Sequence, residues 1–192
     1  MELNIPLLLY AVVQFVAFIF VLVATPIGIF RVTKNHTIAH GVISLWGAKV
    51  DTGNSTLFDP ISDFWSECPG HLLRFRLAEA FAIISIFVYG AAFVLGVIML
   101  FCGSILRWIC LGLNIVGAIT VCIVWATMVR SYFNDDGKEC PALQSVTVYG
   151  AGFALFVAAW VLDVINIFIL LLSICTTVTT ESGQVKQTEV KL

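Results

Sequence analysis

Four long apolar runs constrain the fold of this chain more than any other feature. Each exceeds the roughly 18 residues that a helix needs to cross a bilayer, and none alternates apolar with polar residues as membrane barrel strands do. Only helices and closed barrels satisfy their backbone groups in lipid. The sequence therefore predicts an all-α membrane protein, a bundle of four transmembrane helices that cover residues 6–30, 77–101, 108–129 and 149–174.

Composition supports a membrane location and argues against several functions. The 192 residues are 60% hydrophobic and 11% charged, whereas soluble domains are roughly 45–50% apolar and about 25% charged. Scattered Lys and Arg and a net charge of −2 argue against nucleic-acid binding. The sequence has no phosphate-binding loop, dinucleotide fingerprint or H-E-x-x-H string, and no recognisable nucleophile with its base. We therefore expect no enzyme activity, no cofactor and no metal site.

The connections divide into two sides of the membrane. We treat residues 1–192 as one membrane domain, with loops at 31–74 and 130–148 on one side. Both termini are expected on the other side. The C-terminal residues 175–192 form a polar tail that we expect to be mobile. The excess of Lys and Arg on the loop side would place the loops in the cytosol. The Lys and Arg residues on the loop side are Arg31, Lys34, Lys49, Arg74, Arg76, Arg130 and Lys138. Those on the side of the termini are Arg107, Lys186 and Lys191.

Two glycosylation sequons indicate the opposite orientation. They begin at Asn35 and Asn54 in the long loop, and N-glycosylation requires a lumenal or extracellular site. Cys68 and Cys140 would then be the cysteines of the two external loops. They can pair with each other, remain separate thiols or bond to another molecule, because spacing alone does not fix connectivity.

Polar side chains inside the apolar runs predict an interhelical cluster. Four such residues are Gln14, Asn114, Asp163 and Asn166. At a rise of about 1.5 Å per residue, each lies roughly 9–13 Å from the terminus-side end of its span, so the four fall in one layer of the bundle. A sharper alternative is a proton or ion path through Asp163. At the loop-side end of the second span, Arg76 and Glu79 are three residues apart and predict a local ion pair.

The segments LLLYAVVQFVAFIFVLVATPIGIFR, ISLWGAKVD, RFRLAEAFAIISIFVYGAAFVLG, LRWICLGLNIVGAITVCIVWA and YGAGFALFVAAWVLDVINI carry a family resemblance. Together they resemble the amastins, surface proteins of kinetoplastid parasites, whose plan is similar to that of the claudin group of tetraspan proteins. The resemblance covers almost the whole chain. It implies a plasma-membrane protein with external loops and cytosolic termini, and this implication, with the sequons, outweighs the charge tally.

The resemblance also implies a small extracellular β-rich region around a loop motif. That motif consists of Ser44, Leu45, Trp46, Gly47, Lys49 and Asp51. The chain departs from the amastin signature at two positions, since Val42 and Thr52 stand where the signature has cysteines. A loop disulfide from that pair is impossible here.

The leading functional hypothesis is a surface glycoprotein that presents loop 31–74 for contact with a host membrane or other surface components. The alternative is a proton or ion channel or transporter that uses the polar layer around Asp163. A third hypothesis is an organiser that forms homo-oligomers through small-residue faces, such as Ala92 with Gly96. In all three the lipid bilayer is a partner and nucleic acid is not.

Overall fold

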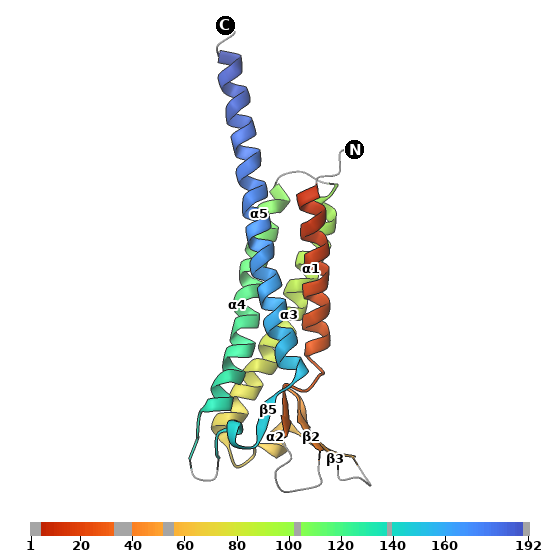
Figure 1. Ribbon diagram of the computed structural model, residues 1–192, viewed down its shortest axis with the longest axis vertical. Coiled ribbons are helices and arrows are strands. Elements are labelled where there is room, and N and C mark those ends of the chain that lie inside the picture. Colours follow the sequence, from red (N-terminus) through yellow and green to blue (C-terminus); the bar gives the residue numbers. More distant parts are fainter. Residues whose placement is uncertain (1–4, 33–39, 52–55, 102–104, 138–139, 190–192) are drawn as a thin grey trace.

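Four long helices run side by side along the molecule in this computed structural model. The structure describes residues 5–32, 40–51, 56–101, 105–137 and 140–189. The long helices are α1 (Ile5–Ala24), α3 (Pro69–Met99), α4 (Ile105–Phe133) and α5 (Ala151–Glu189), and each contains a stretch long and apolar enough to cross a membrane. The strands lie at the end of the bundle opposite the start of α1 and the end of α5 (Figure 1).

The first helix ends earlier than the sequence predicts. It stops at Ala24, the Thr25 hydroxyl then donates to the Val21 carbonyl oxygen at 2.8 Å, and Pro26 has no N–H with which to continue the helix. Phe30 already belongs to a strand, and its side chain is fully buried. The predicted helix over residues 6–30 was therefore wrong at its end, because an apolar run cannot distinguish a buried strand from helix.

The other helices extend beyond the predicted spans. α3 begins at Pro69, a residue favoured in the first turn, and α4 covers all of 108–129 with additional residues at both ends. α5 runs from Ala151 to Glu189, so the helix continues past the predicted span 149–174 into the predicted tail, while its candidate membrane span is Ala151–Thr176. No proline interrupts the sequence after Ala151, and a helix already formed adds one hydrogen bond for each further residue.

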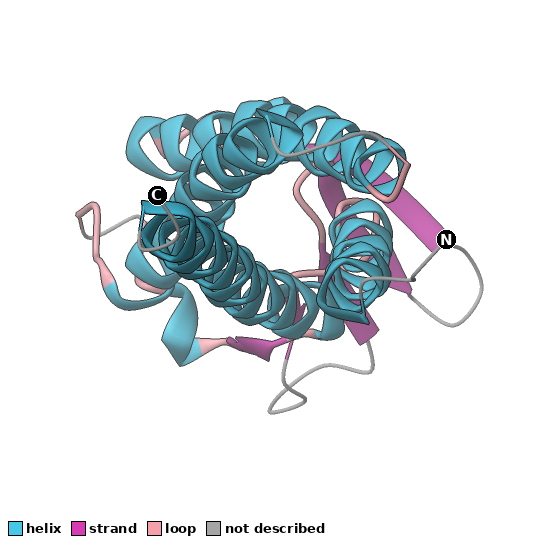
Figure 2. Ribbon diagram, turned by 90° about the horizontal axis from the view of Figure 1, so that it is seen from above, coloured by secondary structure: helices cyan, strands magenta, loops and turns pink. Residues whose placement is uncertain are grey.

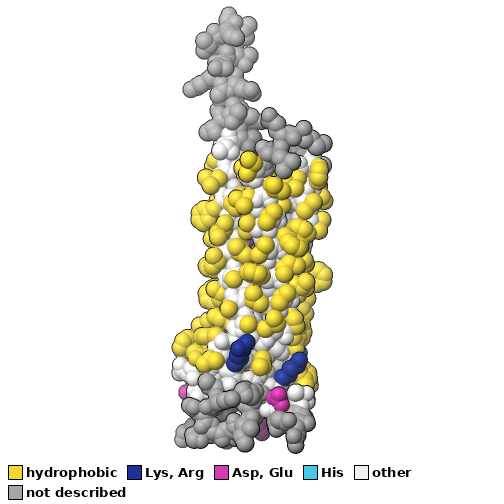
Figure 3. All heavy atoms as spheres, turned by 45° about the vertical axis from the view of Figure 1, so that its right-hand side comes forward, with side chains coloured by type: hydrophobic (Ala, Val, Ile, Leu, Met, Phe, Trp, Pro, Cys, Tyr) yellow, Lys and Arg dark blue, Asp and Glu magenta, His cyan; other side chains and the backbone are white. Residues whose placement is uncertain are grey.

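The bundle presents an apolar surface along its length. α1 and α4 each neighbour α3 and α5, so α1 lies diagonally opposite α4. Figure 2 shows the helices arranged around a common axis. Phe87 is 72% exposed and Phe168 61% exposed. The hydrophobic surface in Figure 3 has dark-blue Lys and Arg side chains at its lower edge. Such a surface is stable in lipid and not in water, so the four spans imply association with a bilayer.

A five-stranded antiparallel sheet covers the loop end of the bundle. Its strands have the order β4-β3-β2-β1-β5. Their bounds are β1 (Phe30–Val32), β2 (His40–Ile43), β3 (Gly47–Asp51), β4 (Thr56–Pro60) and β5 (Thr147–Tyr149), and the short helices α2 (Ile61–Phe64) and η1 (Leu143–Ser145) adjoin them. The predicted fold, a four-helix membrane bundle with a small β-rich loop region, is confirmed.

The inner face of the sheet is part of the core. Phe30 pairs with Ile43, and Ile43 with Ala48, so these three side chains share one face, and all are buried. The Phe30 ring lies 6.4 Å from the ring of Phe75 on α3. The sheet is therefore packed against the helix ends and is not a freely hanging loop.

Candidate functional site

The Ser44-Leu45-Trp46-Gly47 motif forms the tight turn between β2 and β3. The backbone N–H and the hydroxyl of Ser44 both donate to the Gly47 carbonyl oxygen at 2.9 Å. A β-carbon at Gly47 would clash with the backbone oxygen of Asp59 on β4, so only glycine fits beside that strand.

The two central residues of the motif attach the sheet to the bundle. Leu45 is fully buried in the main core. The indole N–H of Trp46 donates to the Thr25 carbonyl oxygen at 3.0 Å, just beyond the end of α1, where helix carbonyls lack intrahelical partners. The remaining motif residues, Lys49 and Asp51, are exposed on β3. The motif is thus a structural turn with an exposed polar extension.

A disulfide joins the two loop segments at the same end of the molecule. Cys68 precedes α3, Cys140 follows α4, and their α-carbons lie 5.8 Å apart. Both residues are buried, at 7% and 6% exposed.

Of the two positions where the amastin signature has cysteines, Val42 lies against Gly28, and Thr52 is outside the described residues.

A polar cluster that the sequence did not reveal lies beside the disulfide. Arg74 donates to Asp136 at 2.6 Å, and the fully buried His71 ring has its Nε2 3.8 Å from the same carboxylate. The ring also stacks on Trp65 with centroids 4.8 Å apart. Arg74 and Asp136 belong to different loop-side segments 62 residues apart, so local spacing gives no signal for this pair. In the described part of the chain, no three His, Cys, Asp or Glu residues gather as a metal site.

The predicted ion pair at the loop-side end of α3 has the expected geometry. Arg76 and Glu79 are 3.0 Å apart, and the Arg76 side chain is 53% exposed. An exposed pair three residues apart on a helix contributes about 0.5 kcal/mol or less. This pair therefore has a minor part in stability.

The four predicted intramembrane polar residues are all buried, and the hydrogen bonds of the described residues join them to other helices in three pairs. The Asn166 amide donates to the Gln14 side-chain oxygen at 2.7 Å and joins α5 to α1. Asn114 donates to the Tyr10 hydroxyl at 2.9 Å, and the Tyr89 hydroxyl donates to Asp163 at 3.1 Å.

These bonds connect different helices around and across the bundle. The two tyrosines bridge the diagonal pairs α1–α4 and α3–α5, which are too far apart for short side chains. A further bond of 3.0 Å joins Ser85 on α3 to Thr120 on α4. Sequence reasoning missed Tyr10 and Tyr89. Tyrosine usually lies at the membrane interface, so a tyrosine within an apolar run was the available signal.

Part of this interior polar network has no partner among the described residues. The atoms concerned are Gln14 Nε2, Asn114 Oδ1, Asp163 Oδ1 and Asn166 Oδ1. The predicted glycosylation residues, Asn35 and Asn54, lie outside the described residues.

The transmembrane bundle, the sheet on its loop end and the disulfide that joins the two loops define a multi-pass membrane protein with a structured loop region. The sequence model of the Amastin surface glycoprotein family matches residues 15–170, which include half of the first span, most or all of the other three and all five strands. The chain belongs to this family, and the resemblance read from its motifs is confirmed. None of the curated proteins matches it.

Proposed function

We propose that the protein lies in the plasma membrane with both termini in the cytosol and presents its sheet for contact with a host membrane or other surface components. The observation that carries the proposal is the exposure of apolar side chains at one edge of the sheet. Leu57 is 60% exposed and Phe58 50% exposed on β4, and Phe64 on the adjoining α2 is 38% exposed. All three lie outside the four candidate spans, so the hydrocarbon core does not account for their exposure.

Strand β4 also offers backbone groups to a partner. It is an edge strand of the sheet, and its only neighbour among the described strands is β3. The outward N–H and C=O groups of an edge strand can pair with an incoming segment, while exposed aromatic side chains supply the apolar contact. This combination favours recognition of a protein surface.

Two observations support an external position of the sheet. Disulfides such as Cys68–Cys140 form and persist in oxidising compartments, which include the cell exterior. The matched family is one of surface glycoproteins. Both favour external loops despite the excess of Lys and Arg on that side.

The test is adhesion of cells that display tagged protein to a monolayer of target cells. We expect the double variant Leu57→Ser, Phe58→Ser to reach the surface in normal amounts and to lose most adhesion. The matched control is Val148→Ser, which alters a 44% exposed residue on β5, at the opposite edge of the sheet. Unchanged adhesion of the double variant, at equal surface density, would refute the proposal.

A second candidate function, proton or ion movement, is favoured by the unpartnered Oδ1 of the fully buried Asp163. The hydrogen bonds that join polar side chains of α4 to polar side chains of other helices extend only from Asn114 to Thr120, about 9 Å of a hydrocarbon core that is about 30 Å thick. This short extent makes it the second choice. Flux into vesicles that contain the purified protein, abolished by Asp163→Asn and retained by Glu79→Gln, would support it. Absence of flux in the wild type would eliminate it.

A further inference from the structure

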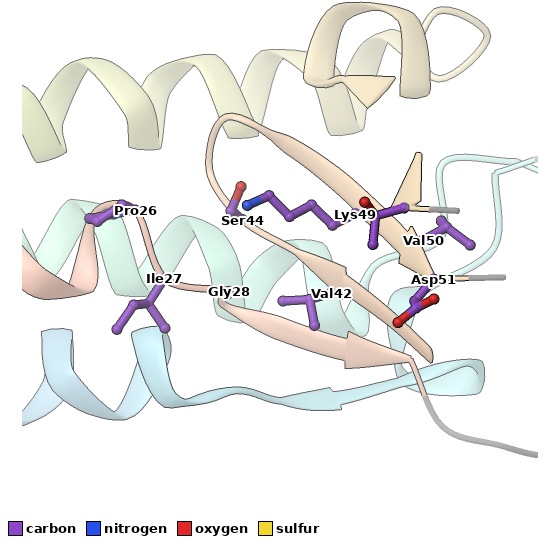
Figure 4. Close-up of a pocket in the computed structure, with 9 residues that line it drawn as sticks. Pro26, Ile27, Gly28, Val42, Ser44, Lys49, Val50 and Asp51 are labelled. Carbon is purple, nitrogen blue, oxygen red and sulfur yellow. The ribbon is translucent and has the colours of Figure 1, made fainter. Parts of the chain in front are cut away.

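A groove of about 380 Å³ lies where the end of α1 meets the outer face of the sheet. Its walls include Pro26 and Ile27 from the segment after α1, Val42 from β2, and Lys49 and Asp51 from β3 (Figure 4). The wall next to the bundle is apolar and the wall on β3 is charged. Thr56 of β4 also lines the groove, whereas Leu57 and Phe58 of the proposed contact do not.

The position of the groove corresponds to the headgroup level of a bilayer. α1 has 20 residues, and at 1.5 Å per residue it is about 30 Å long, the thickness of the hydrocarbon core. Pro26 and Ile27 follow directly and therefore lie at the boundary of the core. In the last turn of α1, Leu22 and Val23 are 42% and 40% exposed. They present apolar side chains to the lipid near the boundary of the core.

Two cationic residues, Arg31 and Lys49, lie on the outer face of the sheet on either side of Val42. Arg31 pairs with Val42, and Val42 with Lys49, so all three side chains are on one face, and the outer two are separated by two strand spacings, roughly 10 Å. Figure 4 shows the Lys49 side chain extending along the sheet toward Ser44 and the end of α1, hence toward the membrane. Within the described part of the chain, neither Arg31 nor Lys49 has an ion pair.

The described lining residues of the groove carry one cation, Lys49, and one carboxylate, Asp51, at opposite ends. Asp51 is its one carboxylate among the described lining residues, and it lies at the end of the groove away from α1. The ammonium group of Lys49 is directed to the opposite end, where the apolar wall begins. A ligand with a negative group next to an apolar chain therefore matches both the charge and the depth of the groove.

We propose that this groove binds a phospholipid with an anionic headgroup from the leaflet that the loops face. Lys49 and Arg31 bind the headgroup, while Ile27 and the exposed side chains of the last turn of α1 contact the acyl chain. This assignment gives a role to cations whose location on the loop side is contrary to the usual charge distribution. It holds whether or not the sheet contacts another cell.

The experiment measures lipid binding to the full chain in a neutral detergent by native mass spectrometry, with phosphatidylserine and phosphatidylcholine of identical acyl chains. We expect tighter binding of phosphatidylserine. Lys49→Gln and Arg31→Gln should each weaken phosphatidylserine binding by up to about fivefold, because an exposed ion pair contributes at most about 1 kcal/mol. Lys49→Arg should retain binding. The matched control is Arg130→Gln, which removes an exposed cation at the loop-side end of α4, away from the groove.

Three results would overturn the proposal. The first is equal binding of both lipids by the wild type. The second is a loss in Lys49→Gln no larger than that in Arg130→Gln. The third is competition by water-soluble glycerophosphoserine at the same concentration as the lipid, which would show a site for a free phosphate compound. The unfolding temperature of each variant, measured in the same detergent, excludes a loss of fold as the cause.

Discussion

Removal of the Cys68–Cys140 disulfide is expected to lower the free energy of unfolding substantially. The two cysteines are 72 residues apart in sequence, and loop-closure entropy for a flexible loop of that length corresponds to about 4 kcal/mol. In a membrane α3 and α4 remain helical and hold the ends of the loop close together. The flexible part is then only about ten residues, for which the same relation gives about 3 kcal/mol. We therefore expect a loss of about 3 kcal/mol.

The assay compares Cys68→Ser, Cys140→Ser and the double variant by reversible unfolding in mixed detergent micelles. Because both single changes remove the same bond, the double variant should be no less stable than either single variant. Cys122→Ser, which alters a free cysteine on α4, is the matched control and should be close to the wild type. Additive losses in the double variant, or losses below about 1 kcal/mol, would refute the reasoning.

Three further predictions concern the packing of the helices and the turn. Leucine at Gln14 and at Asn166, combined in a double-mutant cycle, should give a coupling energy of about 0.6–1.7 kcal/mol, and zero coupling would contradict their hydrogen bond. Gly47→Ala should cost about 1–3 kcal/mol of unfolding free energy, because its β-carbon would approach the backbone of Asp59, and an unaltered unfolding temperature would contradict this. Trp46→Phe, which removes the indole N–H bond together with part of the ring that packs against the core, should cost at least about 1 kcal/mol, and no loss would show that the bond contributes nothing.

The helix bundle was predictable because lipid imposes a simple requirement on sequence. A crossing segment must be apolar over a fixed length and must satisfy its own backbone, so length and hydropathy are sufficient to find it. The ends of the helices were less predictable. Ile29 and Phe30 are as apolar as a span, yet they bury their side chains in or beside the sheet. Their hydropathy indicates that they avoid water, but it does not distinguish burial in the protein core from contact with lipid.

The polar residues inside the bundle were also predictable only in part. Gln14, Asn114, Asp163 and Asn166 stood out because polar groups in hydrocarbon need partners, and the structure buries all four. Their depth placed them in one layer, but depth does not specify which helices are diagonal. The partners of Asn114 and Asp163 are tyrosines on the opposite helices, and only the arrangement of the bundle brings them within reach.

The sequence by itself determined that this chain crosses a membrane with four helices, belongs to the amastin family and carries a β-rich loop around its Leu-Trp-Gly turn. The four helices follow from local composition, the family from short motifs, and the β-rich loop from what the family resemblance implies. Tertiary structure decided that the turn anchors the sheet to α1, and that Cys68 meets Cys140. It also placed Lys49 in a groove at the end of α1. These are contacts between segments distant in the chain, and their geometry depends on packing that no local pattern encodes.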